Sequence, residues 1–229
     1  MPTSPGKIIP VGFLPLKSDT DRHHYYPLFL DVAGKECLIV GGGSVAERKA
    51  LMLLKFHASV TVISPRATKK LVHLADTGAI RILPRTYRYG DLDRAAVVFA
   101  CTDDRDTNGA VRKDAAARGV PVNVVDKPEE CDFIVPSIIK KGDITIAIST
   151  SGRLPLASKK LRQAIEKTVT KDYVAYTRII GALRQHLLDT VPDGRKRRTI
   201  MKYIAAMDIS DVVRTGLKGM KKILGDRVR

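Results

Sequence analysis

The chain has 229 residues, 44% of them hydrophobic and 28% charged, so it can bury the core of one large domain or of one domain with an appendage. Its formal net charge of +16 favours an anionic partner or substrate, such as nucleic acid, a membrane surface, a nucleotide or a polycarboxylate. Three cysteines without a C-x-x-C pair exclude a disulfide scaffold, offer no metal-ligand spacing and suit a reducing cytoplasm. No apolar run reaches the roughly 18 to 20 residues of a membrane span, so we expect a cytoplasmic protein without a membrane partner.

Residues 1–24 hold four prolines among polar residues, which predicts an extended or disordered lead-in. From residue 25 onward, short β-branched runs alternate with segments whose apolar residues recur every three or four positions. This alternation is typical of an α/β fold with a mostly parallel, doubly wound sheet of Rossmann type. The predicted strands are 37–40, 60–63, 80–83, 96–101, 120–125 and 144–149, and the predicted helices between them are 45–56, 67–76 and 107–118.

The pattern changes after residue 152, where helical periodicity continues without an intervening strand. The predicted helices are 156–167, 173–188, 195–207 and 211–224. Residues 151–229 carry 19 Lys and Arg against 7 Asp and Glu, a net charge of +12, whereas residues 1–150 carry only +4. A second, helical and strongly basic region therefore follows the α/β part.

A glycine-rich turn lies between the first predicted strand and the first predicted helix. Gly41, Gly43 and Ala46 fit the pattern G-x-G-x-x-A, in which the first glycine permits a tight turn and the second lets the backbone approach a pyrophosphate. The phosphates would lie at the N-terminus of the helix, which makes Ser44 and Val45 cofactor-binding candidates as well. The competing interpretation is a glycine-rich turn that binds no ligand.

The end of the second predicted strand departs from the usual dinucleotide site. An Asp or Glu normally binds the adenosine ribose there, but this chain has Ser64 followed by Pro65 and Arg66. The Ser64 hydroxyl can still bond a ribose, which keeps NAD in view. Arg66 leaves room for NADP because it could meet a 2′-phosphate, although a solvated loop arginine is at least as good an interpretation.

Two further strands deliver polar side chains to the carboxyl edge of the sheet, where ligands of such folds bind. Thr102 and Asp103 follow the fourth predicted strand and are candidates for the edge of the cofactor site. For Asp104 we favour a cap of the next helix. Asp126 follows the fifth strand, and partial desolvation there could make its carboxylate a general base; the alternative is an ordinary loop aspartate.

Five motifs occur in one order and at matching spacing within residues 25–170. They are Gly41-Gly-Gly-Ser-Val-Ala-Glu-Arg-Lys-Ala, Cys101-Thr-Asp-Asp, Asn123-Val-Val-Asp, Phe133-Ile-Val-Pro-Ser-Ile-Ile and Ile146-Ala-Ile-Ser-Thr-Ser-Gly. Together they resemble the precorrin-2 dehydrogenase family of siroheme biosynthesis, often called siroheme synthases, some members of which are also sirohydrochlorin ferrochelatases. The C-terminal helices match this family only in type.

The resemblance implies an oxidoreductase that passes hydride from precorrin-2 to NAD and yields sirohydrochlorin, into which some members insert Fe²⁺. The family's catalytic aspartate corresponds to Asp126, which would also contact Fe²⁺ transiently. The family segment S-x-S-G-x-x-P corresponds to residues 149–155, with Leu154 where serine is more usual. A plainer interpretation is that residues 149–151 cap the helix beginning near Leu156. The implied substrate contacts are Asn123, Ser149, Thr150, Ser151, Gly152 and Arg153.

The resemblance also implies a division into an NAD-binding Rossmann-type domain of residues 25–136, a connecting and dimerisation segment of 137–170 and a helical domain of 171–229. In the family the middle segment assembles an intertwined homodimer, with the substrate between domains. Precorrin-2 is a polycarboxylate tetrapyrrole, so it suits the basic charge, and the scarcity of aromatic residues argues against a nucleic-acid partner. The alternative function is a dinucleotide-sensing regulatory domain, which would need the glycine turn but not Asp126.

Overall fold

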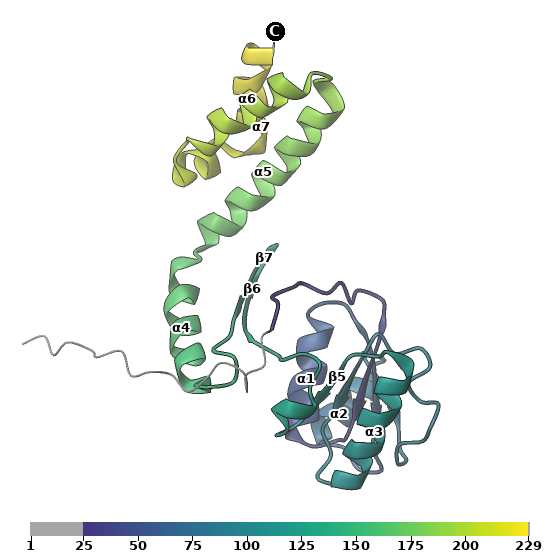
Figure 1. Cartoon of the computed structure of the whole chain (residues 1–229). Coiled ribbons are helices and arrows are strands. Elements are labelled where there is room, and N and C mark those ends of the chain that lie inside the picture. The colour runs from purple at the N-terminus through teal and green to yellow at the C-terminus, as the bar shows by residue number, and fades with distance from the viewer. Residues whose placement is uncertain (1–24, 229) are drawn as a thin grey trace, which may run out of the picture. The chain divides into compact units, whose positions relative to one another are not determined.

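A computed structural model describes residues 25–228, so the predicted lead-in of residues 1–24 lies outside the described residues. The chain divides into two compact units on either side of the bond between Cys131 and Asp132. The first holds the α/β part and the second a hairpin followed by helices (Figure 1). The domain boundaries at residues 136 and 170 stay predictions.

The first unit is built on a five-stranded parallel sheet in the order β3-β2-β1-β4-β5. The direction of strand order reverses between β1 and β4, and the carboxyl ends of strands beside such a reversal are where α/β folds place ligands. The predicted Rossmann-type fold is therefore confirmed. The strands are β1 (Glu36–Val40), β2 (Ser59–Ile63), β3 (Arg81–Leu83), β4 (Val97–Ala100) and β5 (Val122–Val124).

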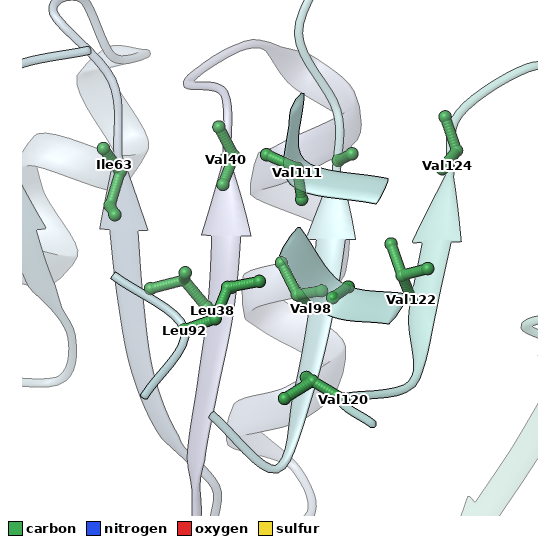
Figure 2. Packing of buried hydrophobic residues seen from close by; sticks show 11 residues of the cluster. Leu38, Val40, Ile63, Leu92, Val98, Val111, Val120, Val122 and Val124 are labelled. Carbon is green, nitrogen blue, oxygen red and sulfur yellow. The ribbon is translucent and has the colours of Figure 1, made fainter. Parts of the chain in front are cut away.

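Both faces of this sheet are covered by helices, α1 (Ser44–Leu54), α2 (Lys69–Asp76) and α3 (Arg105–Arg118), and a short 3-10 helix, η2 (Pro128–Glu130), follows β5. One face packs Leu38 of β1 and Val98 of β4 against Val111 of α3 (Figure 2). All four residues of β4 are buried, as expected for a strand between two others in a parallel sheet covered on both faces. Each fully buried Val or Leu side chain contributes roughly 1.5–3 kcal/mol.

Local chemistry explains where the helices begin and end. The Thr68 hydroxyl accepts a hydrogen bond from the Leu71 N–H and caps α2. The Asp104 carboxylate accepts one from the Asp106 N–H and caps α3, which confirms the role favoured for that residue. Helix α3 ends at Gly119, whose φ of +65° is a left-handed conformation that glycine adopts without steric cost.

The second unit begins with a two-stranded antiparallel hairpin, β6 (Ser137–Lys141) and β7 (Ile144–Ile148). The predicted strand of residues 144–149 is present as β7, which lies outside the parallel sheet and pairs only with β6 among the described strands. Strand β6 was not predicted at all, because two isoleucines followed by two lysines give no clear alternation. The turn at Gly142, with φ of +55°, was the available hairpin signal.

Helices follow the hairpin, as the periodicity predicted: α4 (Pro155–Thr168), α5 (Lys171–Thr190), α6 (Gly194–Ala205) and α7 (Ile209–Val228). The Lys141 ammonium donates to the carbonyls of Glu166 and Val169, at 2.7 and 2.8 Å, and so ties β6 to the end of α4. A second hydrophobic core lies among α5, α6 and α7, around Leu183 and Ile204. Within residues 25–228, no helix is both long and apolar enough to cross a membrane.

Candidate dinucleotide site and the Asp126 loop

The glycine turn between β1 and α1 is fixed by its close approach to two other loops. Gly41 has φ of +122°, and a Cβ atom there would lie 2.5 Å from the Cys101 carbonyl oxygen. A Cβ atom on Gly42 would lie 2.0 Å from the Arg66 carbonyl oxygen. At Gly43, by contrast, a Cβ atom would meet none of the described atoms within 4 Å beyond its chain neighbours. The turn is therefore packed on its inner side and open above Gly43.

Helix α1 begins next to this open position with backbone N–H groups that its own helical hydrogen bonds do not use. Its first helical hydrogen bond runs from the Glu47 N–H to the Gly43 carbonyl, at 3.0 Å. The N–H groups of Ser44, Val45 and Ala46 therefore precede the helical ladder, where the helix dipole favours an anion. The Ala46 side chain is fully buried beneath them. A turn without Cβ atoms, open above Gly43 and adjoining a helix N-terminus, fits a dinucleotide pyrophosphate.

Ser64 lies at the end of β2 and its side chain is largely engaged. Its hydroxyl donates to the Arg66 carbonyl at 2.6 Å, and the residue is buried. The Ser64 oxygen could therefore only accept a hydrogen bond from a ribose hydroxyl. Arg66 is exposed. Sequence reasoning missed Thr68, whose hydroxyl donates to the Glu47 carboxylate at 2.7 Å and joins the start of α2 to α1.

The loop after β4 is held by a buried side chain that the sequence analysis did not single out. The Asn108 amide donates to the Thr102 carbonyl at 2.9 Å and accepts from the Thr102 N–H at 3.3 Å. The Thr102 hydroxyl in turn donates to the Asp104 carbonyl at 2.8 Å. Asp103 lies exposed between them. The two candidates, Thr102 and Asp103, are thus placed at the carboxyl edge of β4, with Thr102 already bonded within its own loop.

Asp126 lies two residues beyond β5, at the same edge of the sheet. Its φ of +57° is unusual, since His57, Asp126 and Ser151 are the only described non-glycine residues with positive φ. Its side chain is exposed within the first unit, so the partial desolvation that we predicted for it is not supplied by that unit's own residues. A bound substrate, or chain outside this unit, would have to supply it.

Asn123, a predicted substrate contact, is bonded at both ends of its amide within the first unit. Its Oδ1 accepts from the Lys49 ammonium at 3.4 Å, and its Nδ2 donates to the Cys131 thiol at 3.5 Å. Lys49 also lies over the Phe99 ring, 5.2 Å from its centroid, and burial lowers the pKa of the Lys49 ammonium. Sequence reasoning missed Lys49 and Cys131, although both lie inside the quoted motifs or next to one.

The remaining predicted substrate residues form a compact turn in the second unit, between β7 and α4. The Ser149 hydroxyl accepts from the Ser151 N–H at 2.9 Å, and the Thr150 hydroxyl accepts from the Leu154 N–H at 3.2 Å. Thr150 also shares a hydrogen bond with Ser158 of α4. Both Ser151 and Gly152 have positive φ, and Arg153 is exposed. The predicted simple cap is wrong, because the cap position is Leu154, whose side chain makes no capping bond.

The comparisons with known proteins agree with this geometry. Residues 28–137 match a family model described as "Putative NAD(P)-binding". A siroheme synthase of Methylococcus capsulatus is 41% identical over 174 residues, which cover 76% of this chain and 37% of that protein. A siroheme synthase of Thioalkalivibrio sulfidiphilus is 36% identical over 192 residues, covering 84% and 39%. Over the matched residues the chain is similar to these siroheme synthases. It spans about two fifths of the length of these relatives.

A solved structure supports the fold of this chain. The chain named "SirC, precorrin-2 dehydrogenase" superposes with a TM-score of 0.69 and 22% sequence identity, over 88% of this chain and 98% of that one. At this level of identity the likeness establishes the fold. Within residues 25–228 there is no group of three or more His, Cys, Asp or Glu side chains placed to hold a metal ion.

Proposed function

We propose that the chain oxidises precorrin-2 to sirohydrochlorin in siroheme biosynthesis, with NAD as the hydride acceptor. The observation that carries this proposal is the meeting of two features at one edge of the sheet. The turn that fits a dinucleotide follows β1, and the carboxylate of Asp126 follows β5, at the carboxyl ends of parallel strands in the same sheet. The similarity to siroheme synthases supports reading this pair as a cofactor site and a proton acceptor.

The residues of the turn would hold the cofactor and Asp126 would handle the proton. The N–H groups of Ser44 to Ala46 would bind the pyrophosphate, Ser64 would face the adenosine ribose, and Thr102 and Asp103 would border the cofactor. Bound NAD supplies the hydride acceptor. Oxidation of precorrin-2 removes a hydride and a proton, and Asp126 is the carboxylate at this edge that would accept that proton at its side-chain oxygen.

The tetrapyrrole would be recognised through its carboxylates. We assign this role to the turn of residues 149–153, with Arg153 offering a cation and the hydroxyls of Ser149 and Ser151 offering hydrogen-bond donors. Asn123 stays a proposed contact, although its amide would have to serve the substrate in addition to Lys49 and Cys131. Ferrous iron insertion is a proposed second reaction, in which Fe²⁺ is substrate and Asp126 contacts it transiently while taking protons from the macrocycle.

A homodimer completes the proposal. The exposed side chains of Leu154, Leu156 and Leu161, at 53, 68 and 50% exposure, are large apolar groups around the start of α4. Exposed apolar side chains gathered in one segment are typical of a surface that another chain covers. The proposed dimer would bury them, together with the hairpin, between two copies of this chain.

The deciding experiment follows the absorbance of the tetrapyrrole during anaerobic incubation of the purified protein with precorrin-2 and NAD. We expect conversion by the wild type and a loss of about 10²- to 10⁴-fold in Asp126→Asn, with NAD affinity unchanged. Asp76→Asn, at an exposed aspartate of α2 outside the proposed site, is the matched control and should keep most of the activity. A protein that binds NAD without any turnover would favour the regulatory domain instead, and adding Fe²⁺ after oxidation tests iron insertion.

A further inference from the structure

A chain of polar side chains runs inside the first unit, from α1 through β5 to Cys131. Lysine can only donate hydrogen bonds, so Oδ1 of Asn123 must face Lys49 and its NH₂ group must face the Cys131 sulfur. The Lys49 ammonium therefore fixes which end of the Asn123 amide accepts a hydrogen bond and which end donates one. Burial of Lys49 strengthens the constraint, because a cation removed from water needs its acceptor.

The Cys131 thiol closes the loop that carries Asp126. Its sulfur accepts from the Val124 N–H at 3.2 Å, and the thiol lies 3.2 Å from the Val124 carbonyl and 3.3 Å from the Lys127 carbonyl, to which it can donate. These partners flank Asp126 on both sides. The thiol thus connects the end of β5 to the far side of the turn on which Asp126 lies.

Asp126 needs such a restraint because its backbone is not in a preferred conformation. A non-glycine residue with φ of +57° is held there by its surroundings, at a cost that aspartate tolerates better than most residues. We propose that Cys131, oriented by Asn123 and Lys49, is a positioning residue that holds the Asp126 loop in its working conformation. This inference rests on the proposed role of Asp126 as the proton acceptor.

The matched pair Cys131→Ala and Cys131→Ser tests the restraint, since alanine and serine have nearly the same volume and differ by one hydroxyl. Cys37→Ala is the control, because Cys37 is fully buried in β1, away from the loop after β5. The first measurement is hydrogen exchange of the Val125, Glu130 and Cys131 amides, whose hydrogen bonds depend on the loop conformation. We expect faster exchange in Cys131→Ala only, with Cys131→Ser close to the wild type.

The second measurement is steady-state precorrin-2 oxidation per NAD-binding site. Misplacement of a catalytic group by about 1 Å can cost 10²-fold, so we expect kcat of Cys131→Ala to fall roughly 10- to 100-fold. The KM for NAD should stay within about twofold, because the glycine turn is not part of the polar chain. Cys131→Ser should recover most of kcat, which a role in stability alone would not require.

The outcomes separate the two proposals. Unchanged exchange in Cys131→Ala overturns the restraint, and faster exchange with an unchanged kcat overturns its role in positioning Asp126. If the wild type does not oxidise precorrin-2, the proposed function has failed, and the exchange comparison still decides whether Cys131 holds the loop. Faster exchange with a lower kcat, both reversed by serine, supports the inference.

Discussion

Replacement of Gly43 by aspartate should separate the stability of the fold from its ability to bind a dinucleotide. Gly43 is the N-cap of α1 and has an extended backbone, with φ of −82° and ψ of −171°, that any L-residue adopts. A Cβ atom there meets none of the described atoms within 4 Å beyond its chain neighbours. Gly43→Asp should therefore leave the first unit folded.

The expected gain in stability can be estimated from three small contributions. Aspartate caps a helix better than glycine by a few tenths of a kcal/mol, and its charge near the helix N-terminus contributes about 0.3–1 kcal/mol. Restricting the unfolded chain adds about 0.4–1 kcal/mol. Together these raise the free energy of unfolding by about 1–2 kcal/mol, which corresponds to an increase in Tm of roughly 2–8 °C for a chain of this size.

The effect on binding has the opposite sign. A carboxylate about 4 Å from a phosphate at an effective dielectric constant of about 20 costs about 4 kcal/mol, or roughly 10³-fold in affinity. Calorimetry with NAD measures this loss, and differential scanning fluorimetry measures Tm. Gly43→Asn is the control, because it caps the helix without the charge and should lose less affinity. An NAD affinity within about threefold of the wild type in folded Gly43→Asp would remove this turn from the site, and a lower Tm would refute the capping argument.

Three further predictions use other parts of the chain. NAD should bind more tightly than NADP, and Arg66→Ala should leave both affinities unchanged in a fluorescence titration; tighter binding of NADP that Arg66→Ala weakens would make Arg66 a 2′-phosphate contact. Light scattering at micromolar concentration should give twice the 25.2 kDa of one chain, and Leu156→Lys should shift the protein toward monomer; a wild type near 25.2 kDa would contradict the dimer. Burial raises the pKa of the Cys37 and Cys101 thiols to about 11. At pH 8 both thiols should therefore be alkylated far more slowly than a free cysteine, as followed by mass spectrometry. Equal alkylation rates for all thiols would count against that burial.

Much of the first unit could be predicted from sequence because its central strands are buried on both faces. Continuous apolar runs such as residues 37–40 and 97–100 by themselves predict buried strands. The glycine turn could be recognised because it directly follows the first of these strands. The hairpin could not be predicted with the same rules. Only residues 139 and 148 of its two strands are buried, so tertiary placement and not local periodicity decides its structure.

The polar chain behind Asp126 was beyond sequence reasoning for a different reason. Lys49 and Asn123 are 74 residues apart, and the two side chains meet only in the folded first unit. Lysine on a helix is more often a solvated residue, and a lone cysteine after a turn carries no periodic signal. Their burial and mutual geometry are properties of the folded unit, whereas Asp126 was identifiable from its position after a strand.

The hydrogen bonds from the Lys141 ammonium to the end of α4 impose an order on the folding of the second unit. A two-stranded hairpin has marginal stability by itself, and the partners that fix this one, the carbonyls of Glu166 and Val169, lie 25 and 28 residues further along the chain. During synthesis the first unit can complete its sheet once β5 has emerged, whereas the hairpin gains its anchor only after α4 is formed. We therefore expect the second unit to fold late, with β6 and β7 the last paired strands to become protected.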